Sequence, residues 1–287
     1  MEKNNNCFLL ADGGSTKVDW RLIQSGQPVL QVITKGANPF FRSQEDITDE
    51  LKTTLVPQLQ DFPVEAIYFF GAGCVSEEKN AIVRSAIAEA IPAKTIEVAS
   101  DLLAAAKGLC GRNKGIVCIL GTGSNSCFYD GEKIAKNVPP LGYILGDEGS
   151  GAVLGKLFLG ACLKNQLSSE IKERFFAQYS FTLPELLNKV YNEPLPNRFL
   201  AGFSPFIREN LADKTVYDLL YHAFTDFFVK NVRQYDYQNN PVHFTGSVAY
   251  AYKVVLQQTA KDLNLEIGKI VSSPMDGLIE YYSFCAK

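Results

Sequence analysis

Two short segments of this 287-residue chain combine glycine with hydroxyl side chains directly after an apolar, strand-like run. Glycine is usually kept where a turn or the close approach of another group requires it. Successive backbone N–H groups at such a hairpin tip form a small nest for anionic oxygens. Neither segment has the spacing of a Walker loop or of a G-x-G-x-x-G turn, and a pair of plain hairpin turns is the alternative interpretation. The duplication favours two loops that bind the phosphates of one nucleotide, formed by Asp12, Gly13, Gly14, Ser15 and Thr16 and by Gly121, Thr122, Gly123 and Ser124.

One aspartate is a candidate both for the N-cap of a helix and for a general base. Asp101 follows the strand-like segment "KTIEVA" and precedes the helix-like segment "LLAAAKGL". This places it at the carboxyl edge of a sheet, where α/β proteins build their sites. Phosphoryl transfer to an alcohol needs a carboxylate there to accept the hydroxyl proton. An N-cap of the helix is the alternative role, and the two roles are compatible.

Other polar residues have both a chemical and a structural interpretation. Asp12 ends a strand beside the first glycine loop, where it is either a residue that holds Mg²⁺ through water or a plain turn residue. Asp147 and Glu148 precede an apolar helical run, where acids also favour the helix dipole. Asn38 lies before a proline and is either a turn residue or a ligand for hydroxyl groups. Lys17 is a strand-face lysine or a phosphate ligand.

The spacing of apolar residues predicts a mixed α/β layer architecture for the first part of the chain. Three strands form a meander, and strands joined through helices then lie parallel to the first. The expected strands are 7–12, 17–24, 28–34, 65–71 and 95–100, and the expected helices are 43–60, 78–91 and one beginning at Asp101.

The same pattern restarts at residue 115. Residues 115–138 again predict strand, glycine-rich turn, strand, hairpin turn and strand. A short strand at 242–244 then enters a helix through Gly246 and Ser247. Two copies of one pattern indicate two lobes.

Composition limits the function classes. The chain is 46% hydrophobic and 21% charged with a net charge of −3, so it lacks the basic field that long nucleic acids require. No run reaches the roughly 20 apolar residues of a membrane span, and the first residues lack a secretory signal, so we expect a cytoplasmic protein with no membrane partner. The seven cysteines are scattered, and we expect reduced, mostly buried thiols rather than a metal site.

The chain resembles a known superfamily through an ordered set of segments. These are "ADGGSTKVDW", "KGANPF", "ASDLLAA", "ILGTGSNS", "LGYILGDEGSGA" and "HFTGSVA". They occur in the order found in the actin-like ATPase superfamily and most resemble the N-acetylglucosamine kinase branch of the BadF/BadG/BcrA/BcrD-type group. The resemblance implies two ribonuclease H-like lobes with a central nucleotide and substrate cleft. It implies a first lobe at 1–112, to which the C-terminal helix at 275–287 returns, and a second lobe at 113–274.

The resemblance also implies an activity and a role for each motif. The expected reaction is ATP-dependent phosphorylation of an amino sugar, N-acetylglucosamine to N-acetylglucosamine 6-phosphate, with Mg²⁺. Asp101 would be the base, the two glycine loops would bind the phosphates of ATP, and Gly246 and Ser247 would lie at the adenosine. The implied substrate-binding residues are Asn38, Gly142, Asp147 and Glu148.

One departure and two other function classes stay open. Leu141 stands where kinases of this branch often have a tryptophan, which leaves N-acetylglucosamine, glucosamine, N-acetylmuramic acid and glucose as alternatives. An ATPase activator of the same superfamily would need closely placed cysteines for an iron–sulfur cluster, and the sequence shows none. A non-catalytic sugar or nucleotide sensor is the third class. Dimers are common among such relatives, which leaves a homodimer open.

Overall fold

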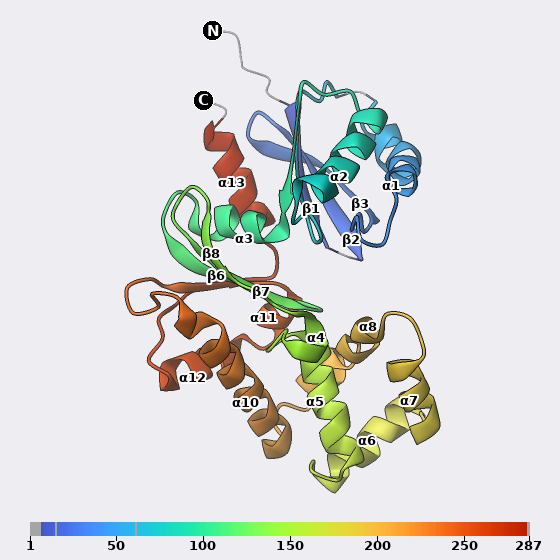
Figure 1. The fold of residues 1–287 in the computed structure, drawn as a ribbon, viewed down its shortest axis with the longest axis vertical. Coiled ribbons are helices and arrows are strands. Elements are labelled where there is room, and N and C mark those ends of the chain that lie inside the picture. The colour runs from blue at the N-terminus through green and yellow to red at the C-terminus, as the bar shows by residue number, and fades with distance from the viewer. Residues whose placement is uncertain (1–6, 15, 61, 286–287) are drawn as a thin grey trace. The chain divides into compact units, whose positions relative to one another are not determined.

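The computed structural model describes residues 7–14, 16–60 and 62–285, so Ser15 of the first glycine loop lies outside the described residues. The chain divides into two compact units (Figure 1). Unit 1 comprises Met1–Asn113 and Pro274–Lys287, and unit 2 comprises Lys114–Ser273.

Unit 1 is built on a five-stranded mixed sheet with the order β3-β2-β1-β4-β5. Its strands are β1 (Cys7–Gly13), β2 (Lys17–Gln24), β3 (Gln27–Lys35), β4 (Ala66–Gly71) and β5 (Thr95–Ser100). β1, β2 and β3 form an antiparallel meander, while β4 and β5 run parallel to β1. The carboxyl ends of β1, β4 and β5 therefore lie at one edge of the sheet, as the sequence predicts.

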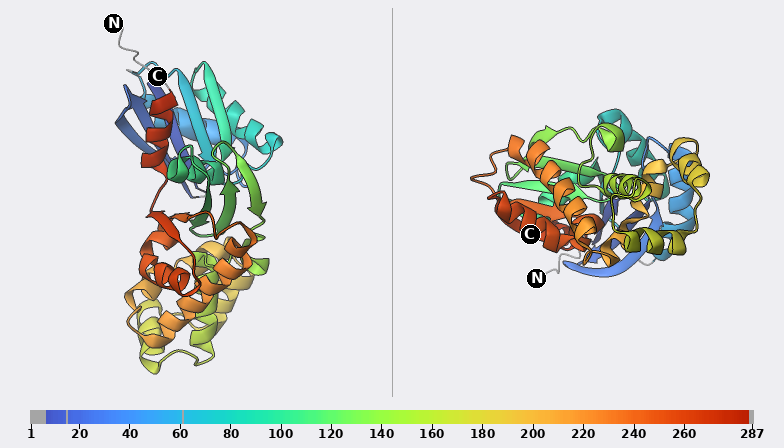
Figure 2. Two further views of the ribbon diagram at one scale, coloured as in Figure 1. Left: turned by 90° about the vertical axis from the view of Figure 1, so that its left-hand side faces the viewer. Right: turned by 90° about the horizontal axis from the view of Figure 1, so that it is seen from below.

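Helices cover both faces of this sheet. The helices α1 (Gln44–Glu50) and α2 (Glu77–Ala90) pack on one face, with Leu9 and Ala11 of β1 in their core cluster. On the other face, Phe8 and Leu10 pack against α3 (Asp101–Cys110) and α13 (Met275–Cys285). Figure 2 shows α13, in red, beside the blue strands of the same unit. The C-terminal helix thus completes the core that the N-terminal strand begins.

The segment predicted as one helix at 43–60 changes pitch twice. After α1, a π-helical turn covers Leu51–Leu55 and a 3₁₀ turn covers Val56–Gln58. The hydroxyl of Thr53 bonds back to the carbonyl of Asp49 at 2.8 Å, which competes with regular helix bonds. Pro57 has no N–H to continue an α-helical ladder. The expected helix therefore forms, but its second half is irregular.

Unit 2 repeats the sheet of unit 1. Its order is β10-β9-β6-β7-β8, with β6 (Gly115–Leu120), β7 (Ser124–Tyr129), β8 (Ile134–Val138), β9 (Val242–Thr245) and β10 (Ile267–Val271). β6 pairs antiparallel with β7 and parallel with β9, as β1 does with β2 and β4. The predicted two-lobed α/β fold is confirmed. β10 was not predicted, because its five residues include Gly268 and its register with β9 is interrupted.

The helices of unit 2 gather on one side of its strands, below them in Figure 1. They are α4 (Gly142–Leu145), α5 (Gly151–Leu163), α6 (Ser169–Tyr179), α7 (Leu183–Tyr191), α8 (Pro196–Ala201), α9 (Ser204–Glu209), α10 (Lys214–Lys230), a 3₁₀ turn (Val232–Gln234), α11 (Ser247–Ala251) and α12 (Lys253–Asp262). The three phenylalanines of α10 are buried there, as expected for packing residues, with Phe224, Phe227 and Phe228 all in the core. Among the described residues, no helix is long and apolar enough to cross a membrane.

Candidate active site

Strand register brings the two candidate aspartates of unit 1 to the same edge of its sheet. Gly13 is paired with Gly71 of β4, and Gly71 is paired with Ser100 of β5. Asp12 directly precedes Gly13, and Asp101 directly follows Ser100. The parallel strands therefore place both carboxylates at the carboxyl edge, where the sequence predicts them.

Asp101 is the first residue of α3 and is not its N-cap. The cap is Ser100, whose Oγ accepts a hydrogen bond from the N–H of Leu103 at 3.3 Å. The N-cap interpretation of Asp101 is therefore wrong, because the preceding serine already supplies the capping oxygen. Burial raises the pKa of Asp101 to about 6, although the N–H groups of Leu102 and of Asp101 itself act in the opposite direction. A carboxylate of this pKa is well matched to accepting a proton near neutral pH.

The loop that follows β4 contacts Asn38 and lies near Asp101. Asn38 is buried, with 8% of its surface exposed, and its Oδ1 accepts a hydrogen bond from the N–H of Phe40 at 3.0 Å. Gly73 lies against this amide at a φ of +86°, and a Cβ at Gly73 would overlap Asn38 Oδ1. Burial, with the nearby Asp101 carboxylate, raises the pKa of the Cys74 thiol to about 12. The loop Gly71–Cys74 thus touches Asn38 and neighbours Asp101.

Sequence reasoning missed this loop. The signal was present as "GAGC", with one glycine at the end of a buried strand and a second two residues later. Gly73 is needed both for its left-handed backbone and for the space that Asn38 fills.

The contact between Gly73 and Asn38 gives a testable prediction. For the sugar kinase activity that the resemblance implies, we expect Gly73→Ala to displace the Asn38 amide and to raise the KM for the acceptor about tenfold, the cost of a disturbed polar contact, with little change in the KM for ATP. Gly111→Ala is the matched control, because Gly111 has a φ of +62° in the same unit and no neighbour within 4 Å of an added Cβ. Steady-state kinetics of both variants distinguish the effect of the contact with Asn38 from the effect of strain in a left-handed backbone. Equal effects of the two substitutions would contradict the prediction.

In the first glycine loop, packing explains why residue 13 is a glycine, whereas Gly14 has open space beside it. A Cβ at Gly13 would lie 3.0 Å from both Phe69 Cζ and the carbonyl oxygen of Phe70, so the fold itself requires that glycine. Gly14 is exposed, and a Cβ there would meet only the carbonyl oxygen of Lys17, at 3.5 Å. The N–H of Gly14 donates to that carbonyl at 2.9 Å, so the hairpin already uses it. The open side of Gly14 leaves room for another molecule.

Besides the glycines, the loop contains Asp12 and Thr16, and Lys17 directly follows it. Thr16 and Lys17 are exposed, and Asp12 is half-buried. Thr16 is tied to the segment before Asn38, because its carbonyl accepts a hydrogen bond from the N–H of Gly36 at 2.9 Å. The loop and the Asn38 segment are therefore connected within unit 1.

The second glycine loop is held by the start of α5. The carbonyl of Gly121 accepts a hydrogen bond from the N–H of Gly151 at 2.8 Å, and that of Thr122 accepts one from Ala152 at 3.1 Å. The N–H of Gly121 donates to the carbonyl of Gly123 at 2.9 Å. A Cβ at Gly121 would have its nearest neighbour 4.0 Å away, so no packing constraint requires this glycine.

Asp147 lies against the second glycine loop. Its Oδ1 accepts a hydrogen bond from the N–H of Ser124 at 3.2 Å, and its backbone has a φ of +52°. Burial raises the pKa of Asp147, while the Ser124 N–H lowers it and the neighbouring Glu148 raises it. The structure thus brings together Asp147, which the resemblance assigns to the sugar, and Ser124, which it assigns to the phosphates.

The other residues of this segment have different surroundings. Glu148 is engaged with the end of α10, with Lys230 Nζ at 3.6 Å and Asn231 Nδ2 at 3.3 Å. Gly142 is exposed at a φ of +74° and opens α4, and its carbonyl accepts a hydrogen bond from Gly146 at 2.8 Å. Glu148 and Gly142 are therefore part of the structure of the turn that carries Asp147.

Gly246 and Ser247 lie at the same sheet edge as the second glycine loop. Thr245 is paired with Ile119, so the next residue along each strand reaches Gly246 and Leu120. Gly246 has a φ of +113°, and a Cβ there would overlap the carbonyl oxygen of Leu120. The close approach of the two strands thus requires a glycine at position 246. Ser247 is exposed at the start of α11.

Comparison with solved structures places the chain among sugar kinases. No protein-family model and no curated protein matches it. A Porphyromonas gingivalis protein described as a "putative N-acetylglucosamine kinase" is 45% identical, with a TM-score of 0.93, 96% of this chain covered and 99% of that one. The chain belongs to the N-acetylglucosamine kinase-like branch of the actin-like ATPase superfamily.

Two more distant structures share the fold of this kinase-like chain. A Chromobacterium violaceum protein with the same description is 19% identical, with a TM-score of 0.73 and coverage of 96% of this chain and 99% of that one. A ROK family glucokinase from Streptomyces griseus, in complex with glucose and AMPPNP, is 14% identical, with a TM-score of 0.58 and coverage of 97% and 98%. These likenesses support the two-lobed fold.

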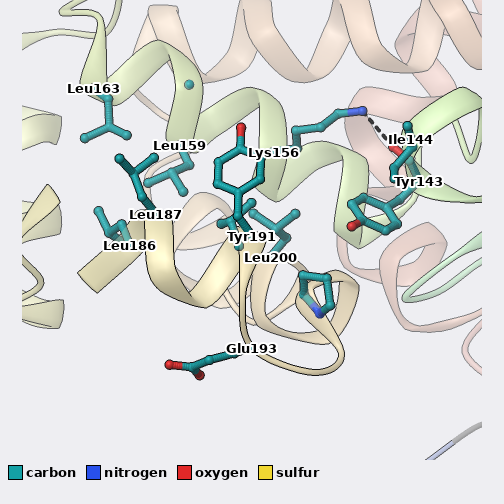
Figure 3. A pocket seen from close by; sticks show the side chains of 13 residues that line it. Tyr143, Ile144, Lys156, Leu159, Leu163, Leu186, Leu187, Tyr191, Glu193 and Leu200 are labelled. Atoms are coloured by element: carbon teal, nitrogen blue, oxygen red, sulfur yellow. Dashed lines mark hydrogen bonds between the residues drawn. The ribbon is translucent and has the colours of Figure 1, made fainter. Parts of the chain in front are cut away.

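A pocket of about 620 Å³ in this kinase-like protein lies outside the predicted site residues (Figure 3). Its lining is mostly apolar, with Leu159 and Leu200 among the side chains, and a hydrogen bond joins Lys156 Nζ to the carbonyl of Tyr143 at 2.7 Å. This bond ties α5 to the turn that carries Asp147. The one acidic residue of its lining, Glu193, accepts hydrogen bonds from Asn188 and Lys189, and none of the predicted site residues lines the pocket, so we place the candidate site elsewhere.

The side chains of this kinase-like protein suit a metal whose ligands are mainly water and phosphate oxygens. Among the described residues, no cluster of three or more His, Cys, Asp or Glu side chains could hold a metal ion. Mg²⁺ in nucleotide sites keeps several waters and uses one or two carboxylates together with phosphate oxygens. Asp12, half-buried at the end of β1, fits that requirement.

Proposed function

We propose that this protein is an ATP-dependent sugar kinase that phosphorylates an amino sugar, with N-acetylglucosamine to N-acetylglucosamine 6-phosphate as the first expectation. The observation that carries the proposal is Asp101, a carboxylate at the carboxyl edge whose pKa is raised to about 6 by burial. The 45% identical relative described as a "putative N-acetylglucosamine kinase" supports the substrate class.

The acceptor side follows from the chemistry of the residues. Asp101 accepts the proton of the sugar hydroxyl as that oxygen attacks the γ-phosphorus, and the bond to the β,γ-bridging oxygen breaks. Asn38 and Asp147 bind other sugar hydroxyls and orient the acceptor. Gly142 and Glu148 complete the proposed set by holding the segment that carries Asp147, Glu148 through its contacts with Lys230 and Asn231.

The nucleotide side uses the glycine loops. The open space beside Gly14 and Gly121 supports phosphate binding there, because internal packing gives no reason for either glycine. We assign the neighbouring hydroxyls Ser15, Thr16, Thr122 and Ser124 to the phosphates, and Gly246 and Ser247 to the adenosine. Asp12 would hold, through water, the Mg²⁺ that binds with ATP, and this ion would neutralise part of the phosphate charge.

Release of ADP with a panel of sugars tests the proposal. With MgATP alone we expect slow hydrolysis, and with the preferred amino sugar an increase of at least about 100-fold, because kinases of this type suppress transfer to water. The panel contains N-acetylglucosamine, glucosamine, N-acetylmuramic acid and glucose, and mass spectrometry identifies the phosphorylated product.

Each alternative has its own outcome in this assay. Fast hydrolysis that no sugar changes would support the ATPase activator. Sugar binding in calorimetry without ADP release would support the sensor. Either result would overturn the kinase.

A further inference from the structure

The second glycine loop and the acceptor-side carboxylate are joined by a direct hydrogen bond. Ser124 opens β7, and its N–H donates to Asp147 Oδ1 at 3.2 Å. The two residues are 23 positions apart in the sequence, so the fold and not local chain geometry brings them together. This N–H is the donor that a phosphate nest at the loop would otherwise use.

Gly123 borders the same carboxylate. A Cβ built on Gly123 would lie 3.2 Å from Asp147 Oδ2 and 3.6 Å from Cγ and Oδ1. All three of its nearest neighbours are therefore atoms of one side chain. Gly121, two residues earlier in the loop, has no such neighbour. The two glycines of "GTGS" thus face different surroundings.

The backbone around Asp147 keeps the carboxylate in place. The N–H of Asp147 donates to the carbonyl of Pro140 at 2.8 Å, and its carbonyl accepts from the N–H of Ser150 at 3.0 Å. Gly146 crosses Pro140 so closely that a Cβ would overlap the Pro140 carbonyl oxygen. Lys156 holds the same turn through the Tyr143 carbonyl. The backbone of Asp147 is thus fixed on both sides, so an added Cβ at Gly123 must push on its carboxylate.

We propose that the second glycine loop positions the sugar-binding carboxylate, with the Ser124 N–H orienting Asp147 and with Gly123 as a positioning residue that leaves the space for it. This inference rests on the proposed function. A carboxylate has about four acceptor sites, so one bond from Ser124 leaves capacity for sugar hydroxyls. The loop is then divided, with Gly121 on the nucleotide side and Gly123 on the sugar side.

Two alanine variants of the same loop test this division. For Gly123→Ala we expect the KM for the sugar to rise about tenfold, as for a disturbed charge-assisted hydrogen bond, with the KM for ATP changed less than about twofold. For Gly121→Ala we expect the reverse, because its Cβ enters the open space assigned to phosphate. Neither glycine has a positive φ, so alanine fits the backbone at both positions. An effect of Gly123→Ala on ATP alone would overturn the proposal.

A double-mutant cycle shows whether Gly123 acts through Asp147. In the Asp147→Ala background there is no carboxylate for the new Cβ to meet, so adding Gly123→Ala should raise the sugar KM by less than about twofold more. Additive effects of the two substitutions would mean that Gly123 acts on something else, and would overturn its role as a positioning residue.

A measurement without substrate separates this inference from the proposed function. In NMR spectra of the full chain, the Ser124 amide resonance should follow the protonation of Asp147 with pH, and this dependence should be lost in Asp147→Ala. A Ser124 amide that is the same in both proteins would overturn the orienting bond. If the wild-type protein phosphorylates no sugar, the proposed function and the sugar role fail together, while the amide measurement still decides whether Ser124 orients Asp147.

Discussion

Asp101→Asn is expected to lower kcat by a factor of about 10² to 10⁴, the usual contribution of a general base. The amide keeps the size of the side chain but cannot take the proton of the attacking hydroxyl. Because the proton moves in the transition state, the KM values for sugar and ATP should change little. Single-turnover kinetics with saturating MgATP and sugar measure the effect directly.

The pH profile of kcat is a second test of the same prediction. Burial raises the pKa of Asp101 to about 6, so the wild-type kcat should rise with pH through that value and level off above it. Asp101→Asn should lack this step. A profile whose acid limb is unchanged in the variant would assign the titration to another group.

Asp101→Asn should raise the stability of the protein at neutral pH although it lowers the activity. The folded pKa of Asp101 lies above its usual value of 3.8, so the folded protein binds more protons than the unfolded chain between these pH values. Asp101 therefore lowers the free energy of unfolding as pH rises through this window. We expect Asp101→Asn to stabilise the protein at neutral pH by about 1–2 kcal/mol, allowing for partial solvent screening. Thermal melts at acid and neutral pH should show the gain only at the higher pH.

Ser100→Ala is the matched control for the start of α3. It removes the capping oxygen and should cost about 1 kcal/mol of stability while leaving the Asp101 carboxylate in place. We expect its kcat to stay within a few-fold of wild type. A fully active Asp101→Asn enzyme would defeat the role of Asp101 as base.

The strands of each sheet, and the sheet edge at which the candidate residues lie, could be predicted because both depend on local signals. β1 alternates between two apolar faces, and glycine directly follows it, so the strand and its turn are visible in one short segment. The same holds for β5 and Asp101, because a strand that runs into a helix places the next residue at the carboxyl edge. The repeat of strand, glycine turn and strand at residue 115 predicted the second sheet.

The sequence could not show which neighbour uses each polar group. Ser100 and Asp101 are adjacent and either could cap α3, so only the geometry identified Ser100. The contacts of Glu148 with Lys230 and Asn231 could not be predicted either, because these residues lie more than 80 positions later in the chain. Such pairings depend on tertiary packing, which local propensity does not encode.

Glycine was the least predictable residue type, because it has several physical uses. Gly13 and Gly246 leave room for neighbouring chain segments, Gly73 leaves room for Asn38, and Gly123 leaves room for Asp147. Gly14 alone among these opens toward space without a close neighbour. All five lie at or after the end of a strand, and only the distances from an added Cβ distinguish packing glycines from those that leave space for a ligand.

The other large effect is expected at Asp147. Asp147→Ala should weaken sugar binding by about 1–3 kcal/mol, the cost of losing a buried charge-assisted hydrogen bond. The loss should fall on the sugar, because a site built to bond a hydroxyl discriminates strongly when its partner group is missing. Calorimetric titration with the preferred sugar measures it, and titration with a nucleotide analogue should show little change.

Asp147→Asn separates the charge of this side chain from its position. The amide oxygen can still accept the Ser124 N–H, so the side chain should stay oriented while its charge is lost. We therefore expect Asp147→Asn to weaken sugar binding less than Asp147→Ala does. The control is Asp130→Ala, which removes a carboxylate that accepts the N–H groups of Glu132 and Lys133 in a turn of the same unit. That variant should lose stability but keep its sugar affinity. If Asp147→Ala binds sugar as tightly as Asp130→Ala, Asp147 does not contact the acceptor, and the carboxylate serves only to hold the second glycine loop.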